Sequence, residues 1–185
     1  MMHAAAPLSV SVVRSLDQWM QAMSIRAEVY IGEQAYAYGE EFDGVDLAGA
    51  THLVACLGPE PVGACRVRWF ADFAKLERVS VKRASRSGRV TRALWRATAD
   101  LAGRKGYKIV LGHIERTLLP FWQRTAGFEA RASRPSYVFA GREFVEAVAR
   151  LPHHPEAISL DSPAENVLAS ESDLSGAASH LRVAS

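Results

Sequence analysis

The stretch Leu76-Glu-Arg-Val-Ser-Val-Lys-Arg-Ala-Ser-Arg-Ser-Gly-Arg-Val-Thr-Arg-Ala-Leu94 combines a strand, a polar turn and the start of an amphipathic helix. A turn that leads into a helix presents unpaired backbone N–H groups and the positive end of the helix dipole, and both favour a bound anion. The same segment carries the cationic side chains of Arg78, Lys82, Arg83, Arg86, Arg89 and Arg92. It therefore predicts a site for a phosphate-bearing ligand such as a pyrophosphate.

The composition is that of a soluble globular protein. Hydrophobic residues make up 49% and charged residues 23% of the 185 residues, and no apolar run reaches the roughly 20 residues that span a bilayer. The N-terminus lacks the charged and apolar regions of a signal peptide, so we expect a cytoplasmic protein without a membrane partner. Cys56 and Cys65 fall in separate predicted strands without metal-ligand spacing, which favours reduced thiols over a disulfide and predicts no metal site.

Charge is distributed unevenly along the chain. From His153 onward acidic residues dominate, so the preceding residues are more basic than the whole-chain net charge of +2 indicates. A moderately basic body suits an anionic cofactor, but it is not basic enough to predict a nucleic-acid partner. We expect residues 1–152 to form a single domain and residues 153–185, rich in Ala, Ser and acidic residues, to form a disordered tail.

The first half of the domain is predicted to begin with a strand and a helix. Leu8–Val13 is rich in β-branched residues, and Ser15-Leu-Asp-Gln18 has the form of a capping box. The residues that this helix should turn toward the core are Trp19, Met20, Met23 and Val29. The polar segment from Gly32 to Gly49 indicates a loop or short helix with a turn at Asp43-Gly44.

A hairpin and a strand–helix–strand unit follow. Thr51–Leu57 and Pro61–Phe70 are joined by a short Gly/Pro link, which predicts an antiparallel pair. The unit comprises strand Lys75–Val81, helix Arg89–Arg104 and strand Tyr107–Ile114. Its two strands should be parallel, since a crossover helix connects them.

A short helix at Leu118–Thr125 and one or two closing strands from Phe128 onward complete the predicted domain. The expected fold class is therefore α/β (α+β), with a mixed, mostly antiparallel sheet around a central parallel strand–helix–strand unit and with flanking helices.

Three motifs lie in order on these elements. Val79-Ser-Val81 is followed by Arg86-Ser-Gly-Arg-Val-Thr-Arg-Ala-Leu94, and Phe121-Trp-Gln-Arg-Thr-Ala-Gly-Phe128 comes later. The first two segments resemble the strand and the Arg/Gln-x-x-Gly-x-Gly/Ala loop of the GNAT superfamily of N-acetyltransferases, and the later one resembles its Phe-Tyr-x-x-x-Gly-Phe segment. Features similar to the ElaA-like branch are Glu33-Gln34, Tyr38, the acidic turn Glu41-Phe-Asp-Gly-Val-Asp46 and His52-Leu-Val.

The resemblance implies an enzyme that transfers an acetyl or other acyl group from acyl-CoA to a primary amine by direct attack. In the superfamily, a central strand parts from its neighbour and pairs with the pantetheine arm, while the loop binds the pyrophosphate. The implied cofactor-binding residues are Val79, Ser80, Val81, Arg86, Ser87, Gly88, Arg89, Val90, Thr91, Arg92 and Trp122. The co-substrate would be acetyl-CoA or another acyl-CoA, and no metal is implied.

Two features depart from the superfamily pattern. Arg89 and Thr91 stand where small residues let the backbone approach the pyrophosphate. Arg89 either points outward and contacts a phosphate, or it prevents the usual binding of coenzyme A. Gln123 stands where the superfamily has a tyrosine that protonates the leaving thiolate, and glutamine cannot serve as an acid.

Glu77 and His113 are the catalytic candidates, since each is predicted on one of two neighbouring strands and can act as a base on an amine through water. The alternative for Glu77 is an ion pair with a nearby arginine. The alternative for His113 is a half-buried structural histidine.

The candidates for binding the acceptor are Glu33, Tyr38, Asp43 and Arg66. Asp43 suits a cationic amine, although an aspartate before a glycine also caps a turn. Arg66 shares one predicted sheet face with Arg68, where the pair forms either an ion-paired surface or a site for a substrate carboxylate.

Two further functions remain open on the same fold. The pattern Glu41-x-Asp-x-x-Asp46, with Arg26 before it and Arg66 after it, also resembles acyl-homoserine-lactone and N-acyl amino acid synthases. These enzymes take acyl chains from an acyl carrier protein, which the basic segment would dock. A non-catalytic binding module is the third possibility. The acceptor is a small molecule or a peptide, and the resemblance also allows a homodimer.

Overall fold

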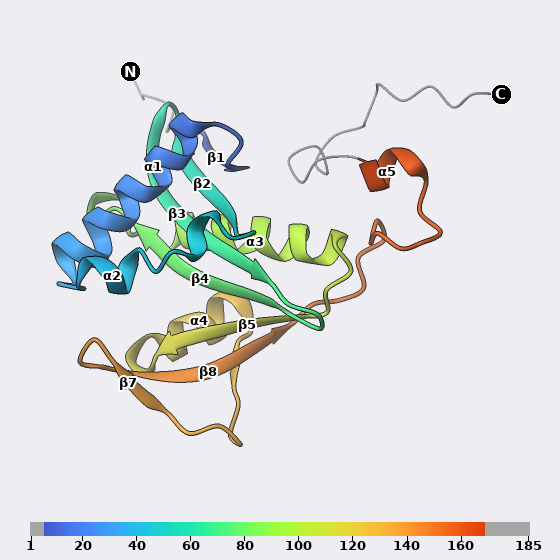
Figure 1. Ribbon diagram of the computed structural model, residues 1–185. Coiled ribbons are helices and arrows are strands. Elements are labelled where there is room, and N and C mark those ends of the chain that lie inside the picture. The colour runs from blue at the N-terminus through green and yellow to red at the C-terminus, as the bar shows by residue number, and fades with distance from the viewer. Residues whose placement is uncertain (1–5, 169–185) are drawn as a thin grey trace.

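The computed structural model describes residues 6–168, and an open twisted sheet forms its centre (Figure 1). In chain order the elements are β1 Leu8–Val12, α1 Leu16–Arg26, the π-helix η1 Ala27–Glu33, α2 Tyr38–Glu41, η2 Val45–Leu47, β2 Thr51–Leu57, β3 Glu60–Trp69, β4 Ala74–Val81, η3 Arg83–Ser85, α3 Arg89–Arg104, β5 Ile109–Glu115, η4 Arg116–Leu118, α4 Leu119–Ala126, β6 Glu129–Ala130, β7 Tyr137–Phe139, β8 Arg142–Arg150 and α5 Ala164–Leu168. The elements η2, η3 and η4 are short 3₁₀ helices.

The described strands form one sheet in the order β1-β2-β3-β4-β5-β8-β6, with β7 also paired to β8. The β4–β5 pair is parallel and the other pairs are antiparallel. The predicted hairpin, the parallel strand–helix–strand unit and the mixed α/β fold are therefore confirmed.

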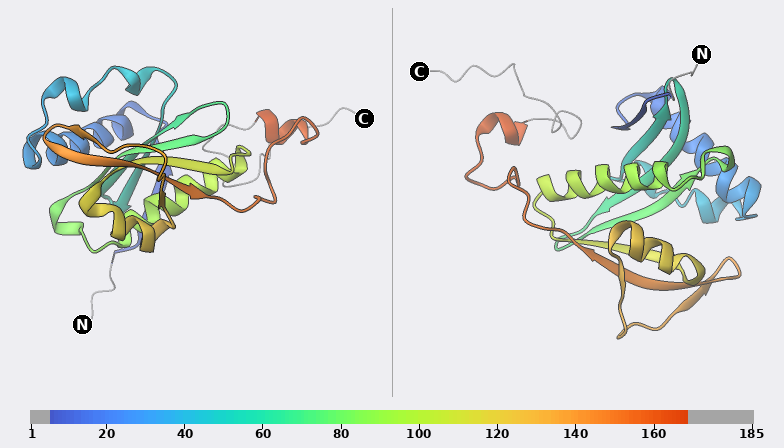
Figure 2. Two further views of the ribbon diagram at one scale, coloured as in Figure 1. Left: turned by 90° about the horizontal axis from the view of Figure 1, so that it is seen from below. Right: turned by 180° about the vertical axis from the view of Figure 1, so that it is seen from behind.

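Helices cover both faces of the sheet. In Figures 1 and 2, α1 and α2 lie on one face, and α3 and α4 lie on the other. Helix α3 has the predicted bounds and buries Val90 and Leu94 in the core. Gly63 on β3 permits this close packing, because a Cβ atom there would lie 2.7 Å from Val90 Cγ1.

Helix α1 follows the predicted pattern with one exception. Gln18 N donates to Ser15 Oγ at 3.2 Å, and Met23 and Val29 are buried. Met20, which we expected to face the core, is 56% exposed. Since each residue advances about 100° around a helix, Met20 lies opposite the side that carries Ala22 and Val29.

The central strands separate partway along their length. Strand β4 pairs with β5 only from Ala74 to Leu76 and then diverges from it (Figure 1). On the other side of β4, Arg78 and Val79 together stand opposite Cys65, and Arg78 has a φ of 54°. This geometry is a β-bulge, which bends a strand and redirects its side chains.

The first residues of the predicted acidic tail contact α3. Ile158 N donates to the Arg104 carbonyl at 2.7 Å, and a Cβ atom on Gly103 would lie 3.1 Å from His154 Cβ. The expected disorder of residues 169–185 lies outside the described residues. Across residues 6–168, no helix combines the length and apolarity needed to cross a membrane. Cys56 and Cys65 are free thiols, as predicted.

Candidate active site

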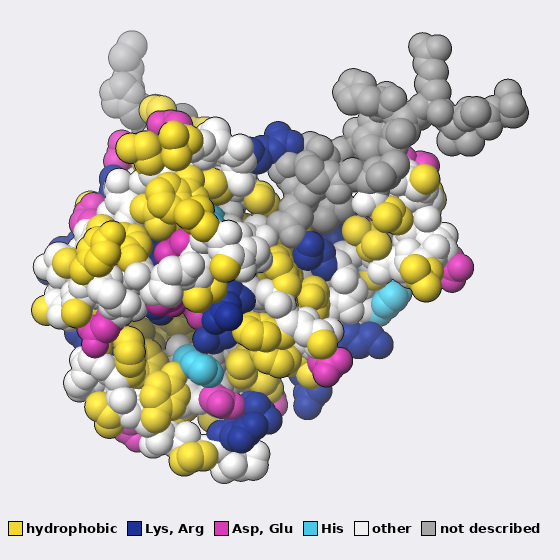
Figure 3. All heavy atoms as spheres, in the orientation of Figure 1, with side chains coloured by type: hydrophobic (Ala, Val, Ile, Leu, Met, Phe, Trp, Pro, Cys, Tyr) yellow, Lys and Arg dark blue, Asp and Glu magenta, His cyan; other side chains and the backbone are white. Residues whose placement is uncertain are grey.

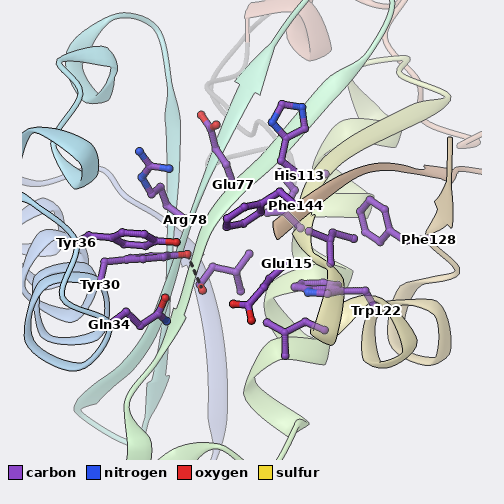
Figure 4. A pocket seen from close by; sticks show the side chains of 15 residues that line it. Tyr30, Gln34, Tyr36, Glu77, Arg78, His113, Glu115, Trp122, Phe128 and Phe144 are labelled. Atoms are coloured by element: carbon purple, nitrogen blue, oxygen red, sulfur yellow. Dashed lines mark hydrogen bonds between the residues drawn. The ribbon is translucent and has the colours of Figure 1, made fainter. Parts of the chain in front are cut away.

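Three connected cavities occur among the described residues where β4 and β5 separate. The central cavity, of about 130 Å³, lies in the gap between the strands (Figure 4). Val79, Glu115 and Trp122 line it and also line a loop cavity of about 460 Å³ beside the turn before α3. Glu77 and His113 line it and also line an aromatic cavity of about 430 Å³ next to α2 and β7. The central cavity thus adjoins both of the others at the separation of β4 and β5.

The loop cavity brings together part of the predicted cofactor site. The predicted residues that line it are Val79, Val81, Arg86, Gly88, Thr91 and Trp122. Ser80 and Val90 are instead buried, and Ser87, Arg89 and Arg92 are exposed outside its lining. Arg89 therefore does not obstruct the cavity, which favours the outward orientation.

Strand β4 presents backbone groups to the gap. Ser80 pairs with Ala64, and Lys82 N donates to the Val62 carbonyl at 2.9 Å, so the alternating pattern directs the backbone groups of Val79 and Val81 away from β3. The carbonyl group of each of these valines accepts a hydrogen bond from a side chain.

The donors to these carbonyls come from different elements. The Tyr30 hydroxyl donates to the Val79 carbonyl at 3.3 Å, and Arg86 Nε donates to the Val81 carbonyl at 2.9 Å. The same alternation turns the N–H groups of the two valines toward the gap.

The turn before α3 forms a cradle at the helix N-terminus. Gly88 is the N-cap of α3 with a φ of 76°, and a Cβ atom there would lie 3.3 Å from Arg92 Nη1. Arg86 Nη2 lies 2.6 Å from Glu33 Oε2. Glu33, a predicted acceptor ligand, is therefore a partner of the cationic turn and lines the loop cavity.

A buried ion network supports the acceptor side of the sheet. Arg26 contacts Glu41 and Asp46, each at 2.5 Å, and Arg78 Nε lies 2.9 Å from Glu41 Oε2. Burial raises the pKa of Glu41, although Arg26 and Arg78 oppose the shift. Arginines from three separate elements therefore contact the acidic turn, namely Arg26 of α1, Arg78 of β4 and Arg66 of β3.

Arg66 does not offer a free guanidinium to a substrate. It is fully buried, and its donors lie 2.7 Å from Asp43, 2.9 Å from Asp46 and 3.0 Å from Glu77. The hydrogen bond from Arg66 lowers the pKa of Asp43, which also accepts from Val45 N at 3.1 Å. The sequence left two roles open for Arg66 and Arg68, an ion-paired cluster or a site for a substrate carboxylate. Arg66 has the ion-paired role.

Glu77 and His113 project to the same side of the sheet (Figure 4). Burial acts to raise the pKa of Glu77, but Lys75 at 2.9 Å and Arg66 bring it below its ordinary value. Burial, reinforced by Lys75, lowers the pKa of His113, whose Nε2 lies 3.9 Å from Glu146 Oε1. His113 is therefore neutral near pH 7 and can accept a proton, whereas Glu77 is an ionised partner of cations.

Aromatic rings form one wall of the aromatic cavity. Tyr36 lies 5.9 Å from Phe139, and Phe144 lies 5.9 Å from Tyr137, measured between ring centroids. Tyr38, a predicted acceptor ligand, is 72% exposed and is not part of this wall.

Several lining residues were not identified from the sequence, namely Tyr30, Tyr36, Glu115 and Phe144. Tyr30 is carried by the π-helix η1, whose register differs from that of an ordinary helix. Glu115 could have been found, because it follows His113 by two residues and so shares its strand face. Across residues 6–168, no group of three or more His, Cys, Asp or Glu side chains is arranged to hold a metal ion.

The sequence matches the model of the Acetyltransferase (GNAT) family over residues 16–128. Among curated proteins, the uncharacterized N-acetyltransferase YjcF of Bacillus subtilis (strain 168) is 31% identical over 117 residues, which cover 61% of this chain and 80% of the relative.

Solved structures share the fold. An acyl-CoA N-acyltransferase from Pseudomonas aeruginosa has a TM-score of 0.67 at 20% identity, covering 78% of this chain and 99% of its own. ElaA from Escherichia coli has a TM-score of 0.64 at 20% identity, covering 77% of this chain and 98% of its own. BjaI, a CoA-dependent acyl-homoserine lactone synthase, has a TM-score of 0.62 at 15% identity, covering 79% and 84%. At these identities the likeness concerns the fold.

Proposed function

The chain belongs to the GNAT family of acetyltransferases, and from this premise we propose that it transfers an acetyl or other acyl group from acyl-CoA to a primary amine of a small molecule or peptide. The observation that carries the proposal is the row of three adjoining cavities at the β4–β5 separation. A donor in the loop cavity and an acceptor in the aromatic cavity would meet in the central cavity.

The residues of the loop cavity fit coenzyme A. The N-terminus of the long helix α3 and the Arg86 guanidinium suit a pyrophosphate. The N–H group of Val81 suits an amide carbonyl of the pantetheine arm, and Trp122 supplies an apolar surface beside it.

The central cavity supplies the chemistry of acyl transfer. The Val79 N–H would donate to the thioester oxygen, where negative charge develops during attack by the amine. His113 would take the proton of the attacking amine directly or through one water. Gln123 is exposed and outside the lining of all three cavities, so the protonation of the thiolate does not use that position.

Thermal unfolding with and without coenzyme A and acetyl-CoA tests the donor assignment, because a ligand that binds only the folded state raises Tm. We expect both ligands to raise Tm, and we expect thiol release from acetyl-CoA when an amine acceptor is added. No shift with either ligand would contradict the proposal. Bare adenosine 3′,5′-bisphosphate should produce a smaller shift, since it lacks the pyrophosphate and the pantetheine arm.

The alternative use of an acyl carrier protein finds less support. The residues that resemble the carrier-dependent synthases, including Arg26, Asp46 and Arg66, form the buried ion network. They therefore stabilise the fold of the acceptor side and do not by themselves indicate a carrier-protein donor, since the docking face of that alternative is the basic segment and not this network. Salt-sensitive binding of an acyl carrier protein without any binding of coenzyme A would reverse this assignment.

A further inference from the structure

We propose that the acceptor is an α-amino acid with an aromatic side chain, and that Arg68 binds its carboxylate. This inference rests on the proposed acyl transfer and specifies the occupant of the aromatic cavity. One wall of this cavity consists of aromatic rings, and the opposite wall carries charged side chains. Among those charged side chains, one cation is less closely paired than its neighbours.

The apolar wall is a chain of ring contacts. Phe139 lies 6.4 Å from Phe144 in addition to the two contacts already described, and Tyr30 stacks on Tyr36 at 5.3 Å. Tyr137 and Phe139 are each 39% exposed, although large rings are ordinarily covered. Rings at such separations leave faces and edges on which another ring can stack.

The opposite wall is charged, but most of its charges are matched. Arg78 lies 3.2 Å from Asp43 as well as close to Glu41. Lys75 lies 2.9 Å from Glu77. Asp43 and Glu77 therefore have little uncompensated charge with which to bind a cationic acceptor, and the carboxylate of Glu40, the third acid of this lining, accepts a hydrogen bond from Ala37 N at 2.7 Å.

Arg68 is the exception among the cations of this wall. Its Nε lies 3.9 Å from Glu77 Oε1, which Arg66 approaches more closely at 3.0 Å, and its side chain is 33% exposed. Its guanidinium carbon lies over the Phe70 ring, 5.0 Å from the ring centroid, and this cation–π contact holds the side chain on that side of the strand. A pre-oriented guanidinium binds a carboxylate through two parallel hydrogen bonds.

The spacing of the strands suits a molecule that carries an amine next to a carboxylate. Arg68 on β3 and His113 on β5 line the same cavity, with Lys75 of β4 directly opposite Arg68. Alternate strands of a sheet are about 10 Å apart, and His113 is two residues further along β5 than Leu111, which is level with Lys75, so the side chains of Arg68 and His113 reach the cavity from opposite ends. Figure 3 shows hydrophobic side chains to the lower left of a histidine and cations above it on this face.

Acetyl transfer to matched acceptors tests the proposal. The acceptors are L-phenylalanine, phenethylamine, which lacks the carboxylate, and L-alanine, which lacks the ring. With acetyl-CoA as donor and thiol release as readout, kcat/KM for L-phenylalanine should exceed that of either analogue by about tenfold or more. Equal or faster turnover of phenethylamine, or of a polyamine such as spermidine, would overturn the inference.

The variant Arg68→Gln identifies the carboxylate ligand. We expect the ratio of kcat/KM for L-phenylalanine to that for phenethylamine to fall toward one, mainly through KM. The control Arg150→Gln, at an exposed position on β8 outside the cavity lining, should retain the wild-type ratio. A ratio that is unchanged in Arg68→Gln would exclude Arg68 as the ligand.

Direct binding separates failure of this inference from failure of the proposed function. Calorimetric titration of 3-phenylpropionate, which has the ring and carboxylate but no amine, requires no turnover. Binding that Arg68→Gln weakens about tenfold, without thiol release from any amine, would support the cavity assignment and contradict the acyl transfer. Thiol release with other amines and no binding of 3-phenylpropionate would overturn the inference alone.

Discussion

Arg86 and Glu33 form an ion pair, with Nη2 of the arginine 2.6 Å from Oε2 of the glutamate. The pair joins the cationic turn before α3 to the end of the π-helix η1, so it closes one side of the loop cavity. Because Arg86 Nε also donates to the Val81 carbonyl, the guanidinium is held at the end of β4 before any ligand arrives.

Replacement of Arg86 should weaken the binding of coenzyme A. In Arg86→Ala we expect Kd to rise about tenfold, since one charge-assisted contact to a phosphate is lost. Isothermal titration of coenzyme A measures the change, and Arg150→Ala provides an arginine control away from the cavity. An unchanged Kd would mean that the turn does not bind the pyrophosphate.

Trp122 should report the arrival of the donor. It lines both the central and the loop cavities, so coenzyme A should change the intrinsic fluorescence of the protein. We expect Trp122→Phe to remove most of that change. The control Trp69→Phe should retain it, because Trp69 stacks on Tyr107 outside these two cavities. A signal that survives in Trp122→Phe would place the donor elsewhere.

The fold was predictable because its central elements have strong, unambiguous patterns. Helix α3 was predicted with its observed bounds, since Val90, Leu94 and Leu101 recur at helical spacing and Gly106 follows the last turn. The short Gly/Pro link after Leu57 fixed the hairpin in the same way. Both signals are local, so they do not depend on tertiary contacts.

The site was only partly predictable, because it depends on contacts between distant segments. Arg66 alternates along its strand like a surface residue, and nothing local shows that Asp43 and Asp46 fold over it. Tyr30 points at Val79 because η1 is a π-helix, and this register has no simple sequence signal. The backbone role predicted for Val79 from the family resemblance depends on its place in the strand and not on contacts between distant side chains.

Breaking the buried ion network should destabilise the fold. Asp46 accepts hydrogen bonds from both Arg26 and Arg66, so Asp46→Asn leaves two buried guanidinium groups less well compensated. We expect the free energy of unfolding to fall by about 3–5 kcal/mol, measured by urea denaturation. The control Glu143→Gln removes an exposed pair with Arg116 and should leave the free energy of unfolding nearly unchanged, because exposed ion pairs contribute little to stability. Equal losses would contradict the structural role of the network.

The ionisation of His113 should set the acid side of the activity profile. Burial lowers its pKa from the ordinary value of 6.5, so the imidazole stays neutral, and able to accept a proton, to a pH below that value. We expect the midpoint of the acid-side fall in kcat/KM to lie below pH 6.5 and His113→Gln to reduce kcat about 100-fold. An NMR titration of the His113 ring, assigned by its loss in that variant, checks the same pKa independently of turnover. A ring that titrates above pH 6.5, or a variant with wild-type kcat, would remove His113 from the role of base, because a merely structural histidine would affect stability but not the acid limb.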